Sequence, residues 1–233
     1  MNFMKLQTLA AILFLGAGLE ARGALYGPYT DLPSSGYIPD GTTAGWWDTR
    51  NVGTVTIPVG WTAEVTVTFT ISGGYNGDLY GYLSHGGVLV PLLNQAGTGL
   101  GGEPQYSFGF TTAGFNNITL ANSATANGSI HNVENPVSGQ SYLPDGGSLS
   151  SFANVNPSGS WTLFFSDLSS DAGPHSQVTS WSMDITAVPE PANVALGLFG
   201  SLSLVAVAAR RREQLRERFS RLRTAFVQWL DAV

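Results

Sequence analysis

Any catalysis by this chain would have to use histidines, carboxylates and hydroxyls, because the sequence contains no cysteine. His85, His131 and His175 stand apart in segments rich in Gly, Asn or Pro, without the His-Glu-x-x-His spacing that binds zinc. We expect all three to be surface loop residues. The sequence has no Gly-x-Ser-x-Gly nucleophile elbow. The residues of a Ser/His/Asp triad can occur in any order along a chain, so spacing does not identify them. The prediction is a protein that is not an enzyme.

Four aspartates are the candidate metal ligands, and they lie at predicted strand ends or in loops: Asp78, Asp145, Asp167 and Asp171. Ca²⁺ prefers clustered carboxylate and carbonyl oxygens on such turns, so calcium is the candidate cofactor. The alternative is that these aspartates cap turns and keep an acidic surface soluble.

Two adjacent tryptophans, Trp46 and Trp47, form the candidate glycan-binding platform, since an indole ring can stack on a sugar. The alternative is that they close one end of a hydrophobic core. The charge pattern excludes another ligand class. Residues 23–191 carry twelve acids and one base, Arg50, so this segment has no basic surface for phosphates and we expect no nucleic-acid partner.

The N-terminus has the pattern of a secretory signal peptide. Lys5 precedes an apolar run over residues 9–19, and the small residues Ala21 and Gly23 follow. We predict a signal peptide at 1–23, read by the secretion translocon, with a buried N-terminal helix as the alternative.

The C-terminal region contains an uncharged stretch, residues 192–209, that is just long enough to cross a bilayer. It is followed by Arg210, Arg211 and Arg212, a cluster that resists translocation and acts as a membrane stop on the cytoplasmic side. Residues 213–233 repeat large apolar residues at helical spacing between arginines. This pattern predicts an amphipathic basic tail on the inner leaflet, with a solvated charged tail as the alternative.

The residues just before that stretch are Val188, Pro189, Glu190 and Pro191, which two prolines make stiff and extended. Together with the uncharged stretch and the arginine cluster, this triplet resembles the PEP-CTERM sorting signal over residues 188–212. The resemblance implies recognition by an exosortase, anchoring in the inner membrane before processing, and delivery to the cell envelope or exterior, often in bacteria that make exopolysaccharide. The tail beyond the arginine cluster is longer than the signal usually has.

Residues 24–187 alternate apolar and polar side chains with interruptions by Gly, Asn, Pro and Ser, as in β-strands. The predicted fold class is all-β, a single jelly-roll-like β-sandwich. We predict strands at 52–57, 61–71, 78–83, 88–93, 106–110, 115–120, 160–167 and 178–186, with Asn76-Gly77 as a hairpin turn. Trp161 and Trp181 each lead a strand with one apolar face, and we expect these two strands side by side.

Two segments resemble the P domain (P/Homo B) of proprotein convertases and bacterial subtilases. They are the run Asn76-Gly-Asp78-Leu79 through Leu83 to Gly87, and the run Ser158 to Asp167 with its continuation Asp171 to Ile185. The resemblance implies a jelly-roll β-sandwich that accompanies a separate protease domain. The favoured function is therefore an exported, non-catalytic, sorted sandwich. The alternatives are a carbohydrate- or protein-binding module of the exopolysaccharide matrix and an accessory domain linked to subtilisin-like proteolysis.

Overall fold

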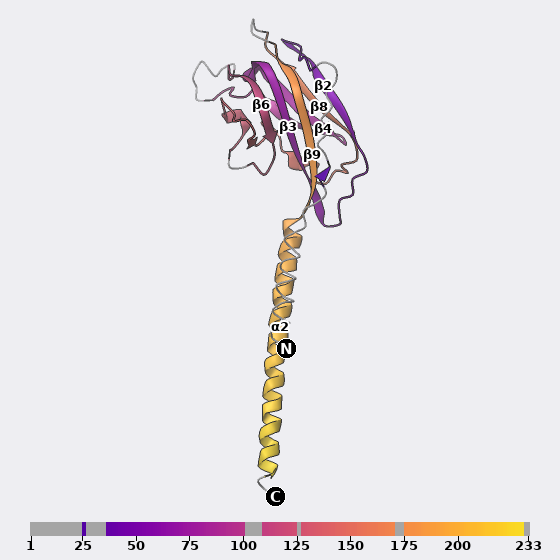
Figure 1. Ribbon diagram of the computed structural model, residues 1–233, viewed down its shortest axis with the longest axis vertical. Coiled ribbons are helices and arrows are strands. Elements are labelled where there is room, and N and C mark those ends of the chain that lie inside the picture. The colour runs from indigo at the N-terminus through magenta and orange to yellow at the C-terminus, as the bar shows by residue number, and fades with distance from the viewer. Residues whose placement is uncertain (1–24, 27–35, 101–108, 125–126, 171–174, 231–233) are drawn as a thin grey trace. The chain divides into compact units, whose positions relative to one another are not determined.

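The computed structural model describes residues 25–26, 36–100, 109–124, 127–170 and 175–230. Side chains are not described for residues 25–26, 191–194, 225–227, 229 and 230. The predicted signal peptide lies outside this part of the chain. The chain divides into two units, a β-sheet body and a C-terminal helix, with the boundary between Val188 and Pro189 (Figure 1).

The strands are β1 (Leu25–Tyr26), β2 (Thr42–Val52), β3 (Trp61–Tyr75), β4 (Leu79–His85), β5 (Val88–Asn94), β6 (Ala113–Leu120), β7 (Ser141–Tyr142), β8 (Gly159–Asp167) and β9 (Gln177–Pro189). Three 3₁₀ turns, η1 (Asn76–Asp78), η3 (Ile130–Asn132) and η4 (Leu149–Phe152), lie between them. One helix, α2 (Pro191–Leu230), follows.

The strands form two sheets that share one core. The five-stranded sheet has the order β1-β9-β3-β6-β7, and the four-stranded sheet has the order β2-β8-β4-β5. Buried residues alternate with more exposed ones along residues 63–71 of β3, all of β4, residues 161–165 of β8 and residues 181–187 of β9. This alternation gives each sheet one face toward the core. The predicted β-sandwich is therefore confirmed in its class.

The core contains the aromatic faces predicted from the sequence. Trp161, Phe165 and Trp181 are each at most 2% exposed. However, β8 belongs to the four-stranded sheet and β9 to the five-stranded one. The expectation that these strands lie side by side is wrong, and their apolar faces belong to opposite layers of one core.

The turn at Asn76-Gly77 also differs from its prediction. The strands that it joins, β3 and β4, are in different sheets, so it is not a hairpin. The backbone N–H groups of Asn76 and Gly77 donate to the carbonyl oxygens of Thr112 and Phe110. These bonds direct the chain from one layer to the other, which a local Asn-Gly signal does not encode.

The predicted strand at 52–57 is wrong as well. Strand β2 ends at Val52, and the N–H of Val55 donates to the Ser158 hydroxyl instead of a sheet partner. The strand that pairs with β8 precedes this segment and includes a register shift between Thr42 and Trp46, which hides its alternation in the sequence. Of the predicted strand at 106–110, residues 106–108 lie outside the described residues, and the other two belong to no strand.

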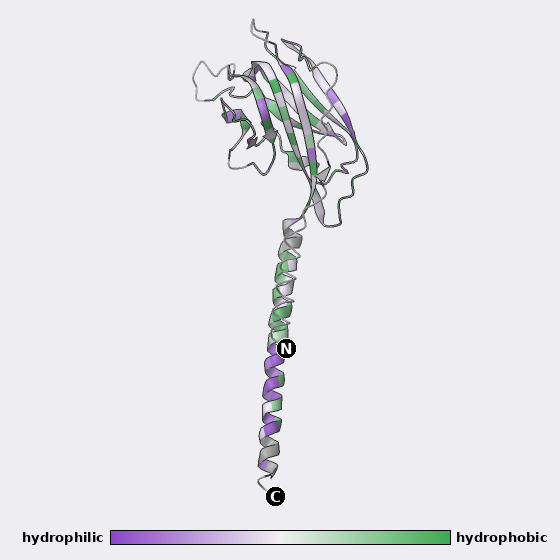
Figure 2. Ribbon diagram, viewed as in Figure 1, coloured by the Kyte–Doolittle hydropathy of each residue, from purple (hydrophilic) through white to green (hydrophobic). Residues whose placement is uncertain are grey.

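Helix α2 runs without interruption for 40 residues. Pro191 is its first residue, where the missing N–H costs nothing. Hydropathy changes along the helix, from an apolar first half to a hydrophilic second half beginning at Arg210 (Figure 2). In the described part of the helix, no segment is both long and apolar enough to cross a membrane. The predicted span at 192–209 begins with side chains outside the described residues, and it stays a prediction.

Candidate functional site

The predicted sorting motif, residues 188–191, lies where the chain passes from β9 to α2. Val188 and Pro189 are the last residues of β9, Pro191 is the first of α2, and Glu190 alone lies between strand and helix. Val188, Pro189 and Glu190 are half-buried, whereas Ala187 just before them is in the core at 2% exposed. The motif therefore begins where burial in the sandwich ends.

The arginine cluster and the tail lie on the same helix. Arg210, Arg211 and Arg212 are exposed. The apolar residues of the tail whose side chains are described, Leu215, Phe219 and Leu222, are between 55% and 69% exposed. Their spacing places them on one face of the helix. The helical conformation predicted for the tail is confirmed to residue 230, and the membrane-surface role stays a prediction.

The structure brings together two of the four candidate calcium ligands. Asp78 and Asp167 are 6% and 3% exposed, and Asp167 pairs with Leu79, the residue after Asp78. Asp145 lies elsewhere, and its Oδ2 is within hydrogen-bond distance of Nδ1 of His131. Asp171 lies outside the described residues. In the part of the chain that is described, no three His, Asp or Glu side chains come close enough to hold a metal ion.

Buried polar groups surround the Asp78–Asp167 pair. The hydroxyl of Ser176, which is fully buried, donates to Oδ2 of Asp167 at 2.9 Å. The turn that carries Asp78 also carries Asn76, which is 1% exposed and whose side-chain amide has no hydrogen-bond partner among the described residues. Calcium at Asp78 and Asp167 stays a prediction, without Asp145.

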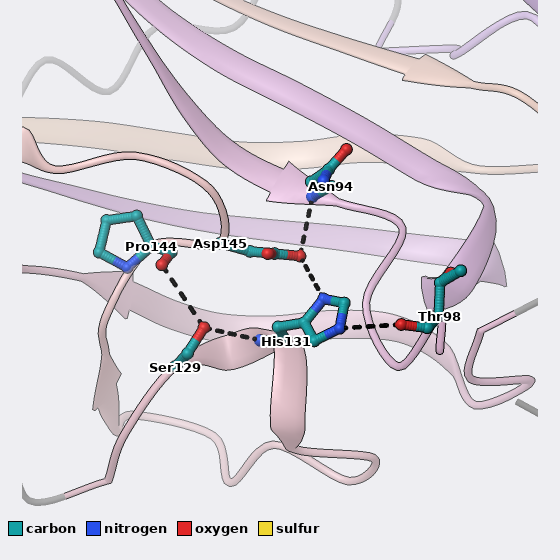
Figure 3. Close-up of polar contacts among 6 residues, drawn as sticks. All are labelled: Asn94, Thr98, Ser129, His131, Pro144 and Asp145. Carbon is teal, nitrogen blue, oxygen red and sulfur yellow. Dashed lines mark hydrogen bonds and ion pairs between the residues drawn. The ribbon is translucent and has the colours of Figure 1, made fainter. Parts of the chain in front are cut away.

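His131 is part of a polar cluster that joins three loops (Figure 3). Its Nδ1 lies 2.8 Å from Oδ2 of Asp145, and its Nε2 lies 3.1 Å from the carbonyl oxygen of Thr98. The same carboxylate oxygen accepts the backbone N–H of Asn94 at 3.0 Å. The Ser129 hydroxyl accepts the backbone N–H of His131. The arrangement resembles half of a catalytic triad, but Nε2 faces a carbonyl where a triad has a nucleophilic hydroxyl.

His85 is the second histidine that the structure places differently from the prediction. It is 6% exposed, and its ring stacks on Trp161 with centroids 4.0 Å apart. Nδ1 faces the carbonyl oxygen of Ser160 at 2.9 Å, and Nε2 faces that of Asn156 at 2.7 Å. His85 is thus a core residue, because alternation along β4 directs it inward. Only His175 is exposed as expected, with Asp40 3.9 Å away.

One charged cluster links the two sheets. Oδ2 of Asp48 on β2 accepts a hydrogen bond from Nε of Arg50 and another from Nε1 of Trp181 on β9, each 2.7 Å long. The Arg50 guanidinium also lies 4.6 Å above the Trp181 ring. Arg50, the one basic residue in the segment 23–191, is therefore held by a carboxylate and an indole ring. On the same strand, β9, partial burial raises the pKa of Asp184 above its usual value.

The two tryptophans of the candidate glycan platform point to opposite sides of β2. Trp46 is 6% exposed and packs beside Phe165 in the core, whereas Trp47 is 63% exposed. Adjacent residues of a strand face opposite ways, so the two indoles cannot form one platform. The prediction is wrong for Trp46, and Trp47 alone is accessible to a ligand.

No family model matches the chain, and no curated protein matches it in sequence. Similar chains occur among the solved structures, and two of these structures are of an Aeromonas sobria serine protease. One is the complex of an Aeromonas sobria serine protease with a chaperone, at 17% identity and a TM-score of 0.41, covering 76% of this chain and 29% of the other. The second is the Aeromonas sobria serine protease, at 16% identity and a TM-score of 0.37, covering 75% and 29%. This chain thus spans less than a third of the length of either chain that it matches.

Proposed function

We propose that this protein is an exported, non-catalytic β-sandwich whose C-terminal region is a sorting signal, recognised at Pro189-Glu190-Pro191 by an exosortase. The observation that carries the proposal is the position of this triplet at the boundary between the sandwich and the helix. A processing enzyme needs a short extended segment that is not part of a folded core. The two prolines keep the segment out of both the helix interior and the sheet interior.

The residues around the triplet support the same order of events. Residues 192–209 would hold the protein in the inner membrane before processing, with Arg210, Arg211 and Arg212 on the cytoplasmic side. Residues 213–233 would lie on the anionic inner leaflet, with Leu215, Phe219 and Leu222 toward the lipid. Removal of this region would release the sandwich to the envelope or the exterior.

The absence of a catalytic role is supported by what the polar residues of the body contact. Nε2 of His131 faces a carbonyl oxygen, and both ring nitrogens of His85 face carbonyl oxygens. A general base needs a ring nitrogen that can reach a substrate proton. These histidines instead use their nitrogens to connect loops and strands.

The sorting proposal is tested by mass spectrometry of the C-terminus of the protein from cells with and without an exosortase. We expect loss of the region after the triplet only in cells that contain the enzyme. Glu190→Ala should prevent processing, so the tail stays attached. Glu213→Ala removes the same kind of side chain beyond the arginine cluster, and this control variant should still lose the tail. A tail retained in both kinds of cell, or lost equally from the Glu190→Ala variant, would refute the proposal.

An accessory role beside a subtilisin-like protease is the second candidate, and it rests on the P-domain resemblance. Leu79, Leu83 and Trp161, which carry much of that resemblance, are at most 1% exposed. Buried residues of this kind are needed for the fold whatever the protein does, so the resemblance favours a fold more than a partner. An increase in the activity of a subtilisin-like peptidase on addition of the purified protein would support this second role.

A further inference from the structure

The outer face of the four-stranded sheet has an unusual composition. Its outward-facing side chains are Trp47, Thr49 and Asn51 on β2, Ser160, Thr162 and Phe164 on β8, Tyr80, Tyr82 and Ser84 on β4, and Leu89 and Pro91 on β5. None of these residues is charged, although residues 23–191 carry twelve acids. The face is therefore an uncharged surface on an acidic body.

Aromatic residues cross this face in a row perpendicular to the strands. Trp47 pairs with Phe164, Phe164 pairs with Tyr82, and Tyr82 pairs with Pro91 in the register of the sheet. Neighbouring strands are about 4.8 Å apart, which is close to the repeat of successive sugar rings in an extended β-linked glycan. The row thus presents apolar contacts at regular intervals along one line.

The two middle rings of this row, Phe164 and Tyr82, are packed against their neighbours. The rings of Phe164 and Tyr82 stack with centroids 4.7 Å apart, and Tyr80 lies against Tyr82 at 6.3 Å. On the other side, the Phe164 ring lies so close to Gly45 that a Cβ there would be 2.4 Å from its Cζ atom. Ordered rings lose little conformational freedom when a ligand binds. The indole of Trp47, 63% exposed, is the accessible end of the row.

Hydroxyl groups form the next row along the strands. Thr49 pairs with Thr162, and Thr162 pairs with Ser84. The hydroxyls of the two threonines are 2.8 Å apart and bond to each other, and each still has lone pairs for a further donor. An aromatic row beside a hydroxyl row matches the two surfaces of a sugar, which has apolar C–H faces and a rim of hydroxyls.

We propose that the outer face of the four-stranded sheet binds an uncharged, extended polysaccharide, with Trp47 as its main contact. The charge distribution favours an uncharged ligand, because the acidic body repels polyanionic glycans and the face has no carboxylate that could bind a polycation. Protein-binding surfaces share the enrichment in aromatic residues, but they are depleted in serine and enriched in arginine, whereas this face has Ser84 and Ser160 and no arginine. The proposal goes beyond sorting and does not depend on it.

The test is affinity electrophoresis of the full chain in a sugar-free detergent, in gels that contain either neutral hydroxyethylcellulose or anionic alginate. We expect retardation by the neutral polymer and none by alginate. Trp47→Ala should weaken the apparent affinity by about tenfold or more, and Trp47→Phe by less. Val137→Ala, which truncates a residue 60% exposed away from this face, should leave the affinity unchanged.

Three results would overturn the proposal. They are the absence of retardation by a panel of neutral glucans and xylans, retardation that Trp47→Ala does not change, and self-association that Trp47→Ala abolishes without any glycan binding. The last result would assign the face to a second copy of the chain. An unchanged melting temperature of the Trp47→Ala variant shows that its fold is intact. Sorting is measured separately at the C-terminus, so one proposal can fail while the other stands.

Discussion

Arg50 and its partners show how one charged side chain can be stable against a sandwich core. Asp48 accepts hydrogen bonds from Arg50 and from Trp181, and Arg50 lies above the indole ring. The side chains of Arg50 and Asp48 are only 10% and 14% exposed, so solvent screens them weakly. Because Asp48 and Arg50 are on β2 and Trp181 is on β9, this cluster connects the two sheets.

Replacing Asp48 by Ala should therefore destabilise the protein by about 3 kcal/mol, since it leaves a nearly buried guanidinium without its carboxylate and an indole N–H without its acceptor. The measurement is the free energy of unfolding from urea titration. Glu134→Ala removes the same charge from an exposed loop and should change this free energy by less than about 0.5 kcal/mol. Equal effects of the two substitutions would mean that the cluster contributes nothing specific.

At the scale of the element, the register shift in β2 depends on a glycine. Gly45 has a φ of +60°, in the left-handed region, and a side chain there would meet the Phe164 ring. Gly87, in the turn between β4 and β5, has a φ of +81° but no atom within 4 Å of the position of a Cβ. An alanine at either position would have an unfavourable backbone conformation, but only at position 45 would its Cβ also clash with neighbouring atoms.

This difference predicts that Gly45→Ala costs about 1–3 kcal/mol more than Gly87→Ala. The strain of a positive φ is common to both variants, so the excess measures the clash of the new Cβ with the Phe164 ring and with the carbonyl oxygen of Phe165, 2.5 Å away. Denaturant unfolding of both variants gives the comparison. If both variants lost the same free energy of unfolding, the structure would accommodate a side chain at position 45 without a measurable loss of stability.

At the scale of the molecule, the core is built from residues of the sheet body. Among the residues whose side chains are described, the core cluster runs from Ile38 to Ile185 and includes none from α2. Strand β9 supplies Val178, Trp181 and Met183, and burial ends at Ala187. The sandwich should therefore fold without the helix that follows it.

A chain that stops after Val188 should melt within about 2 °C of the full chain and in one cooperative transition. The physical reason is that the cut removes Pro189, which is the last residue of β9, together with Glu190 and the helix, and none of these belongs to the core cluster. Differential scanning calorimetry of both proteins provides the test. A large loss of melting temperature would mean that the helix stabilises the sandwich and that processing at the triplet would weaken it.

The β-sheet class could be predicted from the amino-acid pattern, because alternation along segments such as Trp61 to Ile71 requires one buried face. The sequence also identified the uncharged stretch before Arg210, and the structure has a helix there. It failed where the outcome depends on distant contacts. His85 and His131 were predicted as surface loop residues, yet one ring stacks on Trp161 and the other contacts Asp145, 14 residues away.

Tertiary structure alone decided which residues became neighbours. The local sequence at Asn76-Gly77 is a hairpin signal, but the carbonyls of Thr112 and Phe110 redirect the chain to the other sheet. Trp46 and Trp47 are adjacent in the chain and lie on opposite faces, while Trp47, Phe164 and Tyr82, far apart in the chain, share one face. Hydrophobic periodicity is a local property and can be read along the chain. Strand order comes from non-local pairing, which only the folded chain provides.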